Sequence, residues 1–343
     1  MEEKNKIITT ASPHIFKDIS VNKIMWIVVI ALLPAVISSI FFFGLNSLWI
    51  IIASISSALL TEAIIQKLLK KEITISDGSA FITGLLLALV LPPTVPLWIP
   101  VLGSAFAIAI AKHAFGGLGF NIFNPALVGR AFIIASWPVL ASKYITPDGV
   151  TSATPLTILK LQGQEALIQT FGTASALYQK LFVGNIAGAI GETSALALLF
   201  GAAFLFYKKI IDWRIPSLYI GTVFILSLIF GRDPIVALLA GGLLIGAFFM
   251  ATDPVTSPTT KNGRLIFGFG CGFLTVIIRI FSGLPEGVMY SILLMNALTP
   301  LIDRYTIPKP FGTQKSENKI KSLIGKMSGI FHPVSDWWRK ALL

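Results

Sequence analysis

The sequence predicts an all-α polytopic membrane protein, and three observations carry this prediction. Hydrophobic residues make up 55% of the 343-residue chain and charged residues only 13%, against roughly a quarter in a soluble domain. Apolar runs of about the length of a membrane-spanning helix recur along the chain. Lys and Arg flank these runs with a strong bias toward one side, which is typical of membrane orientation. The net charge of +11 therefore indicates topology, and nucleic-acid binding is excluded.

Ten apolar segments are expected to form transmembrane helices. In order they are 24–43, 48–66, 80–91, 97–111, 125–141, 186–207, 216–230, 235–251, 265–282 and 284–302. The third and fourth share a stretch with four prolines near its middle, so the third segment, and its counterpart the eighth, are expected to be short or broken. Such backbone is tolerated at membrane depth only where protein or a polar cavity shields it.

The distribution of Lys and Arg predicts the orientation. A cytoplasmic N-terminus places 21 of the 27 basic residues inside and five outside, and leaves Arg130 within a segment. Both termini are then expected in the cytoplasm. The polar interval 142–185 is expected on the outer face.

The two halves of the chain resemble each other. The stretch from Asp77 to Pro93 and the stretch from Asp233 to Pro254 share an acidic start, a Gly-Leu-Leu run and a proline end. Five segments in each half make the second copy inverted, an architecture that resembles that of urea channels. In such folds two broken helices present their ends to a ligand or ion near the bilayer midplane. Chance recurrence in a Leu- and Gly-rich protein is the alternative.

The sequence therefore divides into five parts. They are a cytoplasmic N-terminal segment (1–23), a first five-helix repeat (24–141), an outer loop (142–185), a second five-helix repeat (186–303) and a basic cytoplasmic tail (304–343). In the tail, apolar residues from Ile320 to Phe331 recur at helical spacing, with lysines elsewhere on the wheel. This pattern predicts an amphipathic helix on the cytoplasmic membrane surface.

The outer loop contains the most informative motif, Asp-Gly-Val-Thr-Ser-Ala-Thr, which ends at Thr154. It has the form of a signal for covalent flavin attachment. Pro155 holds the preceding threonine extended, and small neighbours are expected to leave the Thr154 hydroxyl sterically open to a modifying enzyme. The alternative is a turn at Asp148 followed by a helix cap at Ser152 or Thr154.

The motif, the ten-segment layout and the length together resemble the RnfD family, the D subunits of Rnf ion-translocating oxidoreductase complexes, which are similar to the B subunits of sodium-pumping NADH:quinone oxidoreductases. The resemblance covers nearly the whole chain. It implies an FMN joined through its phosphate to Thr154 by a dedicated flavin transferase, with Asp148, Thr151, Ser152 and Ala153 as recognition residues. The short N-terminal region favours the Rnf type, so no quinone site is predicted.

The resemblance also implies a function. Electrons would pass from ferredoxin to NAD through the FMN, coupled to export of Na⁺ or H⁺ across a prokaryotic cell membrane, with other Rnf subunits as partners. The chain is not expected to be catalytic alone. A non-covalent riboflavin is implied near the cytoplasmic side, without identified residues. The single cysteine, Cys271, excludes an iron–sulfur or zinc site built from this chain alone.

Ionisable residues within or beside the segments form a second set of candidates, because each is costly in lipid. Glu62 and Arg130 are the candidates for an ion path, and Arg130 is alternatively expected to offset a carboxylate or contact flavin carbonyls. Asp77 and Asp233 are expected to cap helices, and Lys112 to be a boundary anchor.

Two other functions stay open on the sequence. Inverted repeats alone would suit a channel or secondary transporter of urea-channel-like architecture without a redox role. The third interpretation is a structural scaffold for redox partners, in which the outer loop is unmodified.

Overall fold

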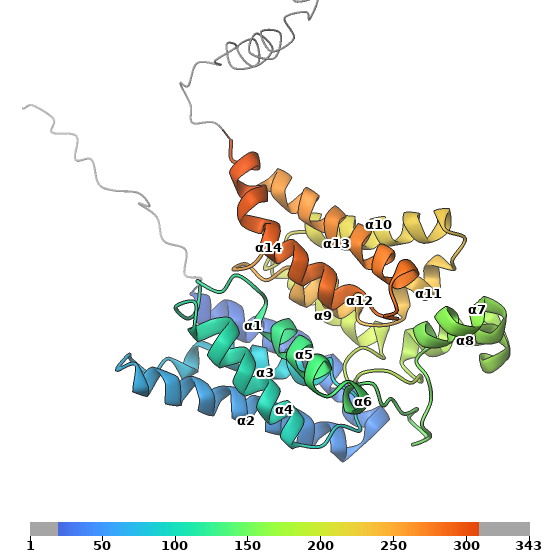
Figure 1. Cartoon of the computed structure of the whole chain (residues 1–343), viewed down its shortest axis with the longest axis horizontal. Helices are drawn as coiled ribbons and strands as arrows, with labels where there is room; N and C mark the ends of the chain where they lie inside the picture. Colours follow the sequence, from blue (N-terminus) through green and yellow to red (C-terminus); the bar gives the residue numbers. More distant parts are fainter. Residues whose placement is uncertain (1–19, 309–343) are drawn as a thin grey trace, which may run out of the picture. The chain divides into compact units, whose positions relative to one another are not determined.

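The computed structural model describes residues 20–308, and these residues form helices joined by short connections (Figure 1). The chain divides into two compact units, Met1–Thr306 and Ile307–Leu343. Among the described residues no β-strand forms, and the isolated antiparallel bridge between Ile145 and Thr151 is the one β-type pairing. This confirms the all-α prediction. The tail helix predicted around 320–331 lies outside the described residues.

Helices fall into a first half, an outer hairpin and a second half. The first half contains α1 (Val21–Phe43), α2 (Leu45–Leu68), the 3₁₀ turn η1 (Ile75–Asp77), α3 (Ser79–Leu89), α4 (Trp98–Phe106) continued by the π-helix η2 (Ala107–His113), α5 (Pro125–Ser136) and α6 (Pro138–Ala141). The outer hairpin is α7 (Pro155–Phe171) and α8 (Ala174–Val183). The second half contains α9 (Ala195–Tyr207), α10 (Arg214–Ile229), α11 (Pro234–Leu239), α12 (Leu243–Ile245) with the π-helix η3 (Gly246–Met250), α13 (Lys261–Phe281) and α14 (Val288–Thr306).

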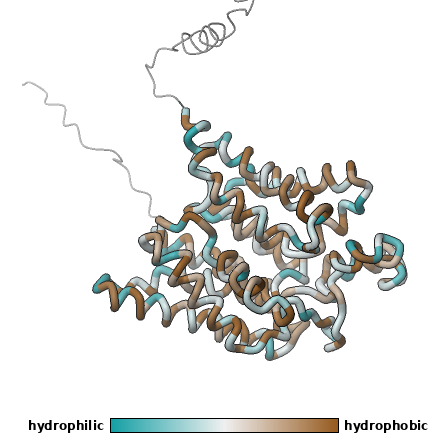
Figure 2. Tube along the Cα trace, in the orientation of Figure 1, coloured by the Kyte–Doolittle hydropathy of each residue, from teal (hydrophilic) through white to brown (hydrophobic). Residues whose placement is uncertain are grey.

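The described part of the chain is that of a multi-pass membrane protein. Helices α1, α2 and α13 are long and apolar enough to cross a membrane, and several shorter apolar helices accompany them. Figure 2 shows hydrophobic residues along the helices of both halves, while hydrophilic residues gather on the outer hairpin. Each of the ten predicted segments contains a helix. Ten crossings and an inverted repeat stay predictions.

The third and eighth segments are short and broken, as predicted. Helix α3 ends at Leu89, just before the paired prolines, and Gly241, with φ of 69°, separates α11 from α12. The break leaves carbonyls without helical partners, and the partly buried Arg279 meets two of them. Its guanidinium donates to the carbonyl of Ala237 at 2.6 Å and to that of Ala240 at 3.3 Å. Protein groups thus replace the hydrogen bonds that lipid cannot offer.

The prediction of a helix starting at residue 186 is wrong, because α9 begins only at Ala195. The preceding chain runs along the end of α3, where the amides of Ile190 and Gly191 donate to the carbonyls of Leu91 (2.9 Å) and Leu89 (2.6 Å). A side chain at Gly191 would place its Cβ 2.6 Å from the Cβ of Leu89. Glycine permits this close approach. The amides of the irregular chain can then bond to carbonyls at the end of α3, whereas the amides of a helix would be used within that helix.

The interval 142–185, expected to be a loop, folds in large part into the hairpin of α7 and α8. Leucines from both helices form a small core that also contacts α11. The Lys160 ammonium donates to the carbonyls of Arg279 at 3.0 Å and Leu284 at 2.8 Å, and to that of Ser282. These bonds tie the start of the hairpin to the connection between α13 and α14. Desolvation lowers the pKa of Lys160, and the positive charge of Arg232 lowers it further.

Candidate functional site

Thr154 is the N-cap residue of α7. Its backbone is extended (φ −67°, ψ 153°), as expected before a proline, and Pro155 occupies the first helical turn. The Thr154 hydroxyl accepts from the amide of Thr157 at 3.3 Å and lies 2.8 Å from the Thr157 hydroxyl. The helix-cap interpretation of the motif is therefore confirmed. It does not exclude a second role for the same hydroxyl.

The prediction that Thr154 is sterically open is wrong in one respect. Only 7% of the residue is exposed, because the start of α7 packs inward through Pro155 and Leu156. The residue instead lines a cavity that is partly open to the surface, since Lys143 and Thr151 at its edge are exposed. Any group joined to the Thr154 hydroxyl would therefore sit in that cavity.

The remaining motif residues form a tight hairpin that leads into α7. The amide of Thr146 donates to the carbonyl of Val150 at 2.9 Å, and that of Ser152 donates to the carbonyl of Tyr144 at 3.2 Å. Gly149, with φ of 79°, makes the turn, as the sequence predicted. Asp148 is exposed at this turn, away from the cavity, whereas Thr151, Ser152 and Ala153 line it together with Thr154.

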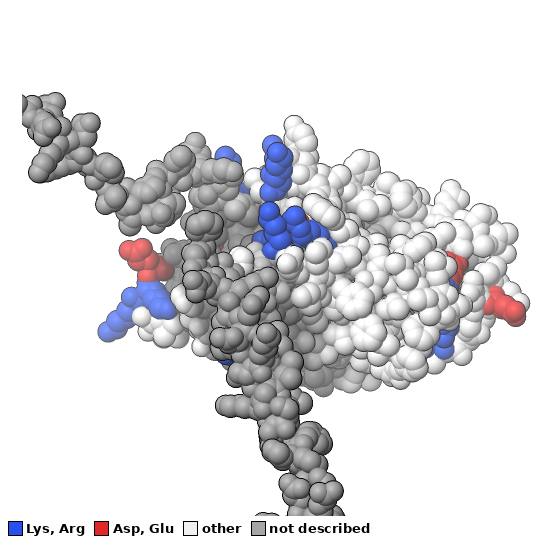
Figure 3. Space-filling view, turned by 90° about the horizontal axis from the view of Figure 1, so that it is seen from above, with Lys and Arg blue, Asp and Glu red and all other residues white. Residues whose placement is uncertain are grey.

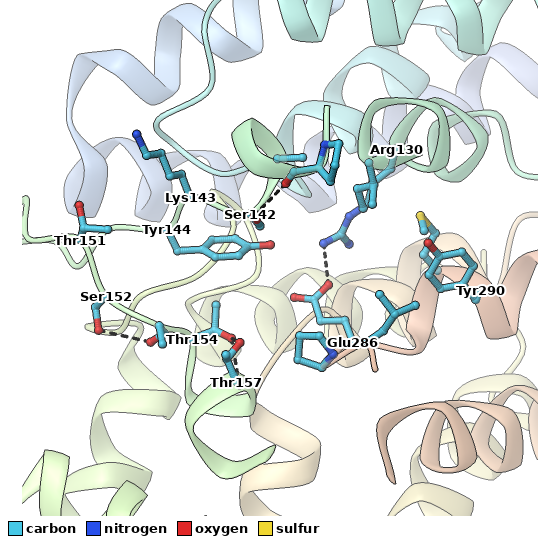
Figure 4. A pocket seen from close by; sticks show the side chains of 17 residues that line it. Arg130, Ser142, Lys143, Tyr144, Thr151, Ser152, Thr154, Thr157, Glu286 and Tyr290 are labelled. Atoms are coloured by element: carbon cyan, nitrogen blue, oxygen red, sulfur yellow. Dashed lines mark hydrogen bonds and ion pairs between the residues drawn. The ribbon is translucent and has the colours of Figure 1, made fainter. Parts of the chain in front are cut away.

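The cavity has a volume of about 540 Å³ and lies where α5, the motif hairpin, the first turn of α7 and the α13–α14 connection meet (Figure 4). Most of its wall surface is apolar, although more than half of the side chains that line it carry a polar or charged group. They include Arg130, Tyr144, Thr151, Thr154, Glu286 and Tyr290. A largely apolar surface with polar groups directed into it suits a cofactor.

Arg130 provides the buried charge of the cavity. Its Nη1 lies 2.9 Å from Glu192 Oε1 and its Nη2 lies 2.7 Å from Glu286 Oε2, while Arg130 itself is 4% exposed. The expectation that Arg130 offsets a carboxylate is confirmed twice over. The structure also brings Arg130 and Thr154 to one cavity, although the sequence offered them as separate candidates. A guanidinium held by two carboxylates has little freedom, so Arg130 stays in one position at the cavity wall.

Glu192 and Tyr144 are site residues that the sequence analysis missed. Glu192 lay within a predicted apolar span, and an acid in such a span was a signal that it needed a partner. The Tyr144 ring lies between Thr154 and Arg130, with its hydroxyl directed toward the arginine (Figure 4). Desolvation raises the pKa of Tyr144, and the negative charge of Glu286 raises it further. The phenol is therefore a neutral hydrogen-bond donor at physiological pH.

Glu62 belongs to a different buried cluster. The Lys112 ammonium lies 2.7 and 2.8 Å from its two carboxylate oxygens and donates to the Ser79 hydroxyl at 2.6 Å. Gln66 adds a bond of 3.1 Å to the same carboxylate. The prediction of Lys112 as a boundary anchor is wrong: the residue is 2% exposed, because the helix of α4 continues through η2 and turns it toward α2.

Other ionisable residues have local roles. Asp77 accepts from the amide of Ser79 at 2.7 Å, and Asp233 accepts from the amide of Ile235 at 2.9 Å. Asp233 is the N-cap of α11, as predicted. Asp77 lies one position before Gly78, the N-cap of α3, and bonds to the first residue of that helix. His113 is buried beside Glu62, with 3.8 Å between Nε2 and the carboxylate, and neither ring nitrogen has a hydrogen-bond partner. In the described range, 20–308, no cluster of three His, Cys, Asp or Glu could hold a metal ion.

A second, smaller cavity of about 140 Å³ lies between the two halves. Asn121 and Asn124 line it, together with Lys112 from the Glu62 cluster and Asp253 beyond η3. The Asn124 side chain accepts from the amides of Ala126 and Leu127 and donates to the carbonyl of Met250. One asparagine therefore starts α5 and joins it to the second half.

Comparisons with known proteins show what this chain is similar to. The family model described as the NQR2, RnfD, RnfE family matches residues 8–312. The chain is 52% identical over 325 residues to the D subunit of the proton-translocating ferredoxin:NAD(+) oxidoreductase complex of Clostridium ljungdahlii, covering 91% of this chain and 98% of the relative. It is 48% identical to the D subunit of the Na(+)-translocating ferredoxin:NAD(+) oxidoreductase complex of Acetobacterium woodii, covering 94% and 100%. It is 40% identical to the D subunit of the ion-translocating oxidoreductase complex of Methanosarcina acetivorans, covering 89% and 97%.

Proposed function

This chain belongs to the NQR2, RnfD, RnfE family, and on that basis we propose that it is the RnfD-type membrane component of an Rnf complex and carries covalent FMN on Thr154. The complex would pass electrons between ferredoxin and NAD and export an ion. Two relatives of similar identity are named for different ions, H⁺ and Na⁺, so identity alone does not select the coupling ion. The chain contributes to this activity as one component of the complex.

One observation carries the proposal. The last residue of a flavin-attachment motif lines a cavity whose opposite wall holds a buried arginine. A phosphoester at the Thr154 hydroxyl would tether a cofactor at the cavity, so that its ring system could occupy the apolar interior. A flavin bound there supplies one- and two-electron chemistry. The residues fit such a group: the volume suits a cofactor site, and hydrogen-bond donors converge from Tyr144 and Arg130.

The chain's own residues then have distinct tasks. Thr154 would anchor the FMN. Thr151, Ser152 and Ala153 are proposed to be recognised by the flavin transferase. Asp148, exposed at the hairpin turn, is accessible for the same recognition. Tyr144 offers a neutral donor. Attachment requires the Thr154 hydroxyl to give up its hydrogen bonds to the Thr157 hydroxyl and amide. Both bonds lie at the first turn of α7.

A second flavin, a non-covalent riboflavin, is proposed for the smaller cavity between the halves. Two amide side chains, Asn121 and Asn124, lie on its wall. Asn124 already bonds to Ala126, Leu127 and Met250, so Asn121 is the amide that could pair with a donor or acceptor of a flavin ring edge. The position is supported by the orientation argument, which places the neighbouring Lys112 toward the cytoplasmic side. Adjustment of the cavity would be needed, since about 140 Å³ is smaller than typical cofactor pockets.

The ion path is proposed to include the Glu62 cluster. The Glu62 carboxylate is 1% exposed, is paired with Lys112 and lies next to the second cavity. Burial of such a charge pair costs free energy, which indicates a structural or transport role. Glu62→Gln keeps the shape and removes the charge. We expect it to slow Na⁺- or H⁺-dependent transport by the intact complex. Unchanged transport would remove Glu62 from the path. Arg130 lies at the first cavity, away from the Glu62 cluster, and it is a candidate for the ion path only if ions pass that cavity.

In-gel fluorescence of the denatured chain tests the attachment. Protein from cells that contain the flavin transferase is expected to fluoresce, and Thr154→Asn is expected to be dark, since asparagine retains a cap but offers no hydroxyl. Thr157→Val is the matched control, because it removes the neighbouring hydroxyl and leaves Thr154 intact. A dark native chain would favour the channel-like or scaffold alternatives. Fluorescence that persists in Thr154→Asn would move the attachment elsewhere.

A further inference from the structure

The turn between α9 and α10 carries a shallow basic pocket. Its volume is about 420 Å³, and Lys209, Arg214 and Arg264 line it together with Asp212. Asp212 bridges the two arginines, with 2.6 Å to Arg214 Nη1 and 2.8 Å to Arg264 Nη1. Three cationic side chains thus face one carboxylate. Lys209 makes no ion pair within residues 20–308. The pocket therefore has a surplus of positive charge.

Asp212 organises the arginines of the pocket. Burial alone would raise the pKa of its carboxyl, but hydrogen bonds from the Arg214 amide and from both guanidinium groups lower it overall. The carboxylate is therefore ionised at neutral pH and holds Arg214 and Arg264 side by side. A second anion that approaches from outside would meet donors already gathered in one place.

An apolar groove of about 530 Å³ runs along α10 from this pocket. The two share Phe206 and Trp213 among their lining residues, so they lie next to each other. Gly221 leaves the groove open, because no atom lies within 4 Å of the place where its Cβ would be. Phe224 and Ile225, exposed by 39% and 58%, line the groove farther along the helix.

We propose that the pocket and the groove together bind one anionic phospholipid, with its phosphate against Lys209, Arg214 and Arg264 and one acyl chain along α10. The charge of the pocket complements an anionic headgroup, and the groove is apolar along an acyl chain's path. Trp213, 59% exposed at the junction, is the side chain expected at the level between headgroups and chains. On the face drawn in Figure 3, Lys and Arg gather in patches beside a broad uncharged surface.

The proposal distinguishes a selective site from the general lipid contact that any spanning helix makes. A phosphatidylcholine carries its own cation and would gain little from three basic side chains, whereas phosphatidylglycerol would gain from each of them. Basic pockets at the cytoplasmic ends of spanning helices are suited to anionic headgroups for this reason. Phospholipid binding at this pocket does not depend on the flavin, so failure to bind would leave the proposed function unaffected.

A matched pair of lysines tests the headgroup contact. Lys209 and Lys70 are the two non-glycine residues with positive φ in the described range, at 55° and 53°, and each is exposed in the turn after a helix. Asparagine tolerates this conformation and carries no charge. Lys209→Asn and Lys70→Asn therefore make the same chemical and backbone change, but only the first does so in the pocket.

Native mass spectrometry of the full chain in detergent would measure the binding, with phosphatidylglycerol and phosphatidylcholine of identical chains as probes. We expect a single retained phosphatidylglycerol and weaker binding of phosphatidylcholine. Lys209→Asn should weaken phosphatidylglycerol binding about fivefold, the effect of one basic residue near a lipid phosphate, and Lys70→Asn should not. Equal binding of the two lipids, or equal effects of the two variants, would overturn the proposal.

A second variant tests the contact with the acyl chain, and it keeps the proposal testable if Lys209→Asn does not fold. Gly221→Leu fills open space in the groove and improves helix propensity, so the fold should be retained. We expect it to weaken phosphatidylglycerol binding while thermal stability in lipid-free detergent is unchanged or higher. A photoreactive group at Ile225 in the intact complex should crosslink lipid. Exclusive crosslinking to another protein of the complex would show that a protein helix fills the groove, and the lipid site would be wrong.

Discussion

At the scale of single residues, Thr154 combines two roles that the sequence presented as alternatives. Its hydroxyl caps α7, and the same hydroxyl faces the cavity where a tethered cofactor could lie. The motif and the following proline made both roles predictable. The burial of Thr154 was not predictable, because it depends on how α7 packs against distant segments. Tyr144 was missed for the same reason.

The cap can be separated from the attachment by measuring stability without flavin. In protein made without the transferase, Thr154→Val should lower the free energy of unfolding by about 1 kcal/mol, because the α7 amide loses its acceptor. Thr154→Asn should leave stability nearly unchanged. Thermal unfolding in detergent would check this. Equal losses in both variants would mean that the hydroxyl does not act as a cap.

Glu286 should tune the potential of a flavin bound at the cavity. Its carboxylate lines the cavity and lies 2.7 Å from Arg130, so Glu286→Gln makes the surroundings less negative. We expect the midpoint potential to rise by some tens of millivolts, since reduction adds negative charge. Redox titration followed by absorbance measures it. Glu165→Gln, on the exposed surface of α7, is the control and should not shift the potential.

At the scale of elements, hydropathy and proline placement predicted where helices occur and which are broken. They could not distinguish a helix from the irregular chain before α9, because both are largely apolar and buried. Gly191 of that chain approaches Leu89 closely, a contact between residues about a hundred positions apart. The hairpin of α7 and α8 was missed because its weak apolar pattern is interrupted at Gly163, with φ of 88°.

Arg279 is expected to stabilise the break between α11 and α12. Arg279→Met keeps a long apolar stem but leaves the carbonyls of Ala237 and Ala240 without their donor. We expect a loss of about 3 kcal/mol in the free energy of unfolding, in keeping with two buried acceptors left unpaired. Thermal unfolding of the purified chain is the measurement. Arg304→Met, at an exposed position, should change little, and comparable effects of the two would contradict this account.

At the scale of the whole molecule, the site is assembled from parts far apart in sequence. Arg130 meets Glu286 across 156 positions and Glu192 across 62. Composition predicted a membrane protein and the motif predicted the attachment point, but the cavity arises only when the first half, the outer hairpin and the second half come together. Single-sequence patterns carry no record of such pairings, so Glu192 could not be assigned a role.

The orientation of the molecule can be tested with its own cysteine content. Cys271 is fully buried, so the chain provides a background that a maleimide should not label. On intact cells, a membrane-impermeant maleimide is expected to label Gln179→Cys in α8 and not Glu72→Cys after α2, both of which are exposed positions. The reverse pattern would place Thr154 on the cytoplasmic side and contradict the predicted topology.

Peptide mass spectrometry of the native chain, isolated from cells that contain the flavin transferase, tests the attachment of FMN to Thr154. We expect the peptide containing Thr154 to gain the mass of FMN less one water, and fragmentation to locate the phosphoester on this residue. The new bond joins the phosphorus to the Thr154 oxygen and displaces one hydroxyl of the phosphate. Overall, this hydroxyl and the proton of Thr154 are lost as water. An unmodified Thr154 peptide at full recovery would contradict the account.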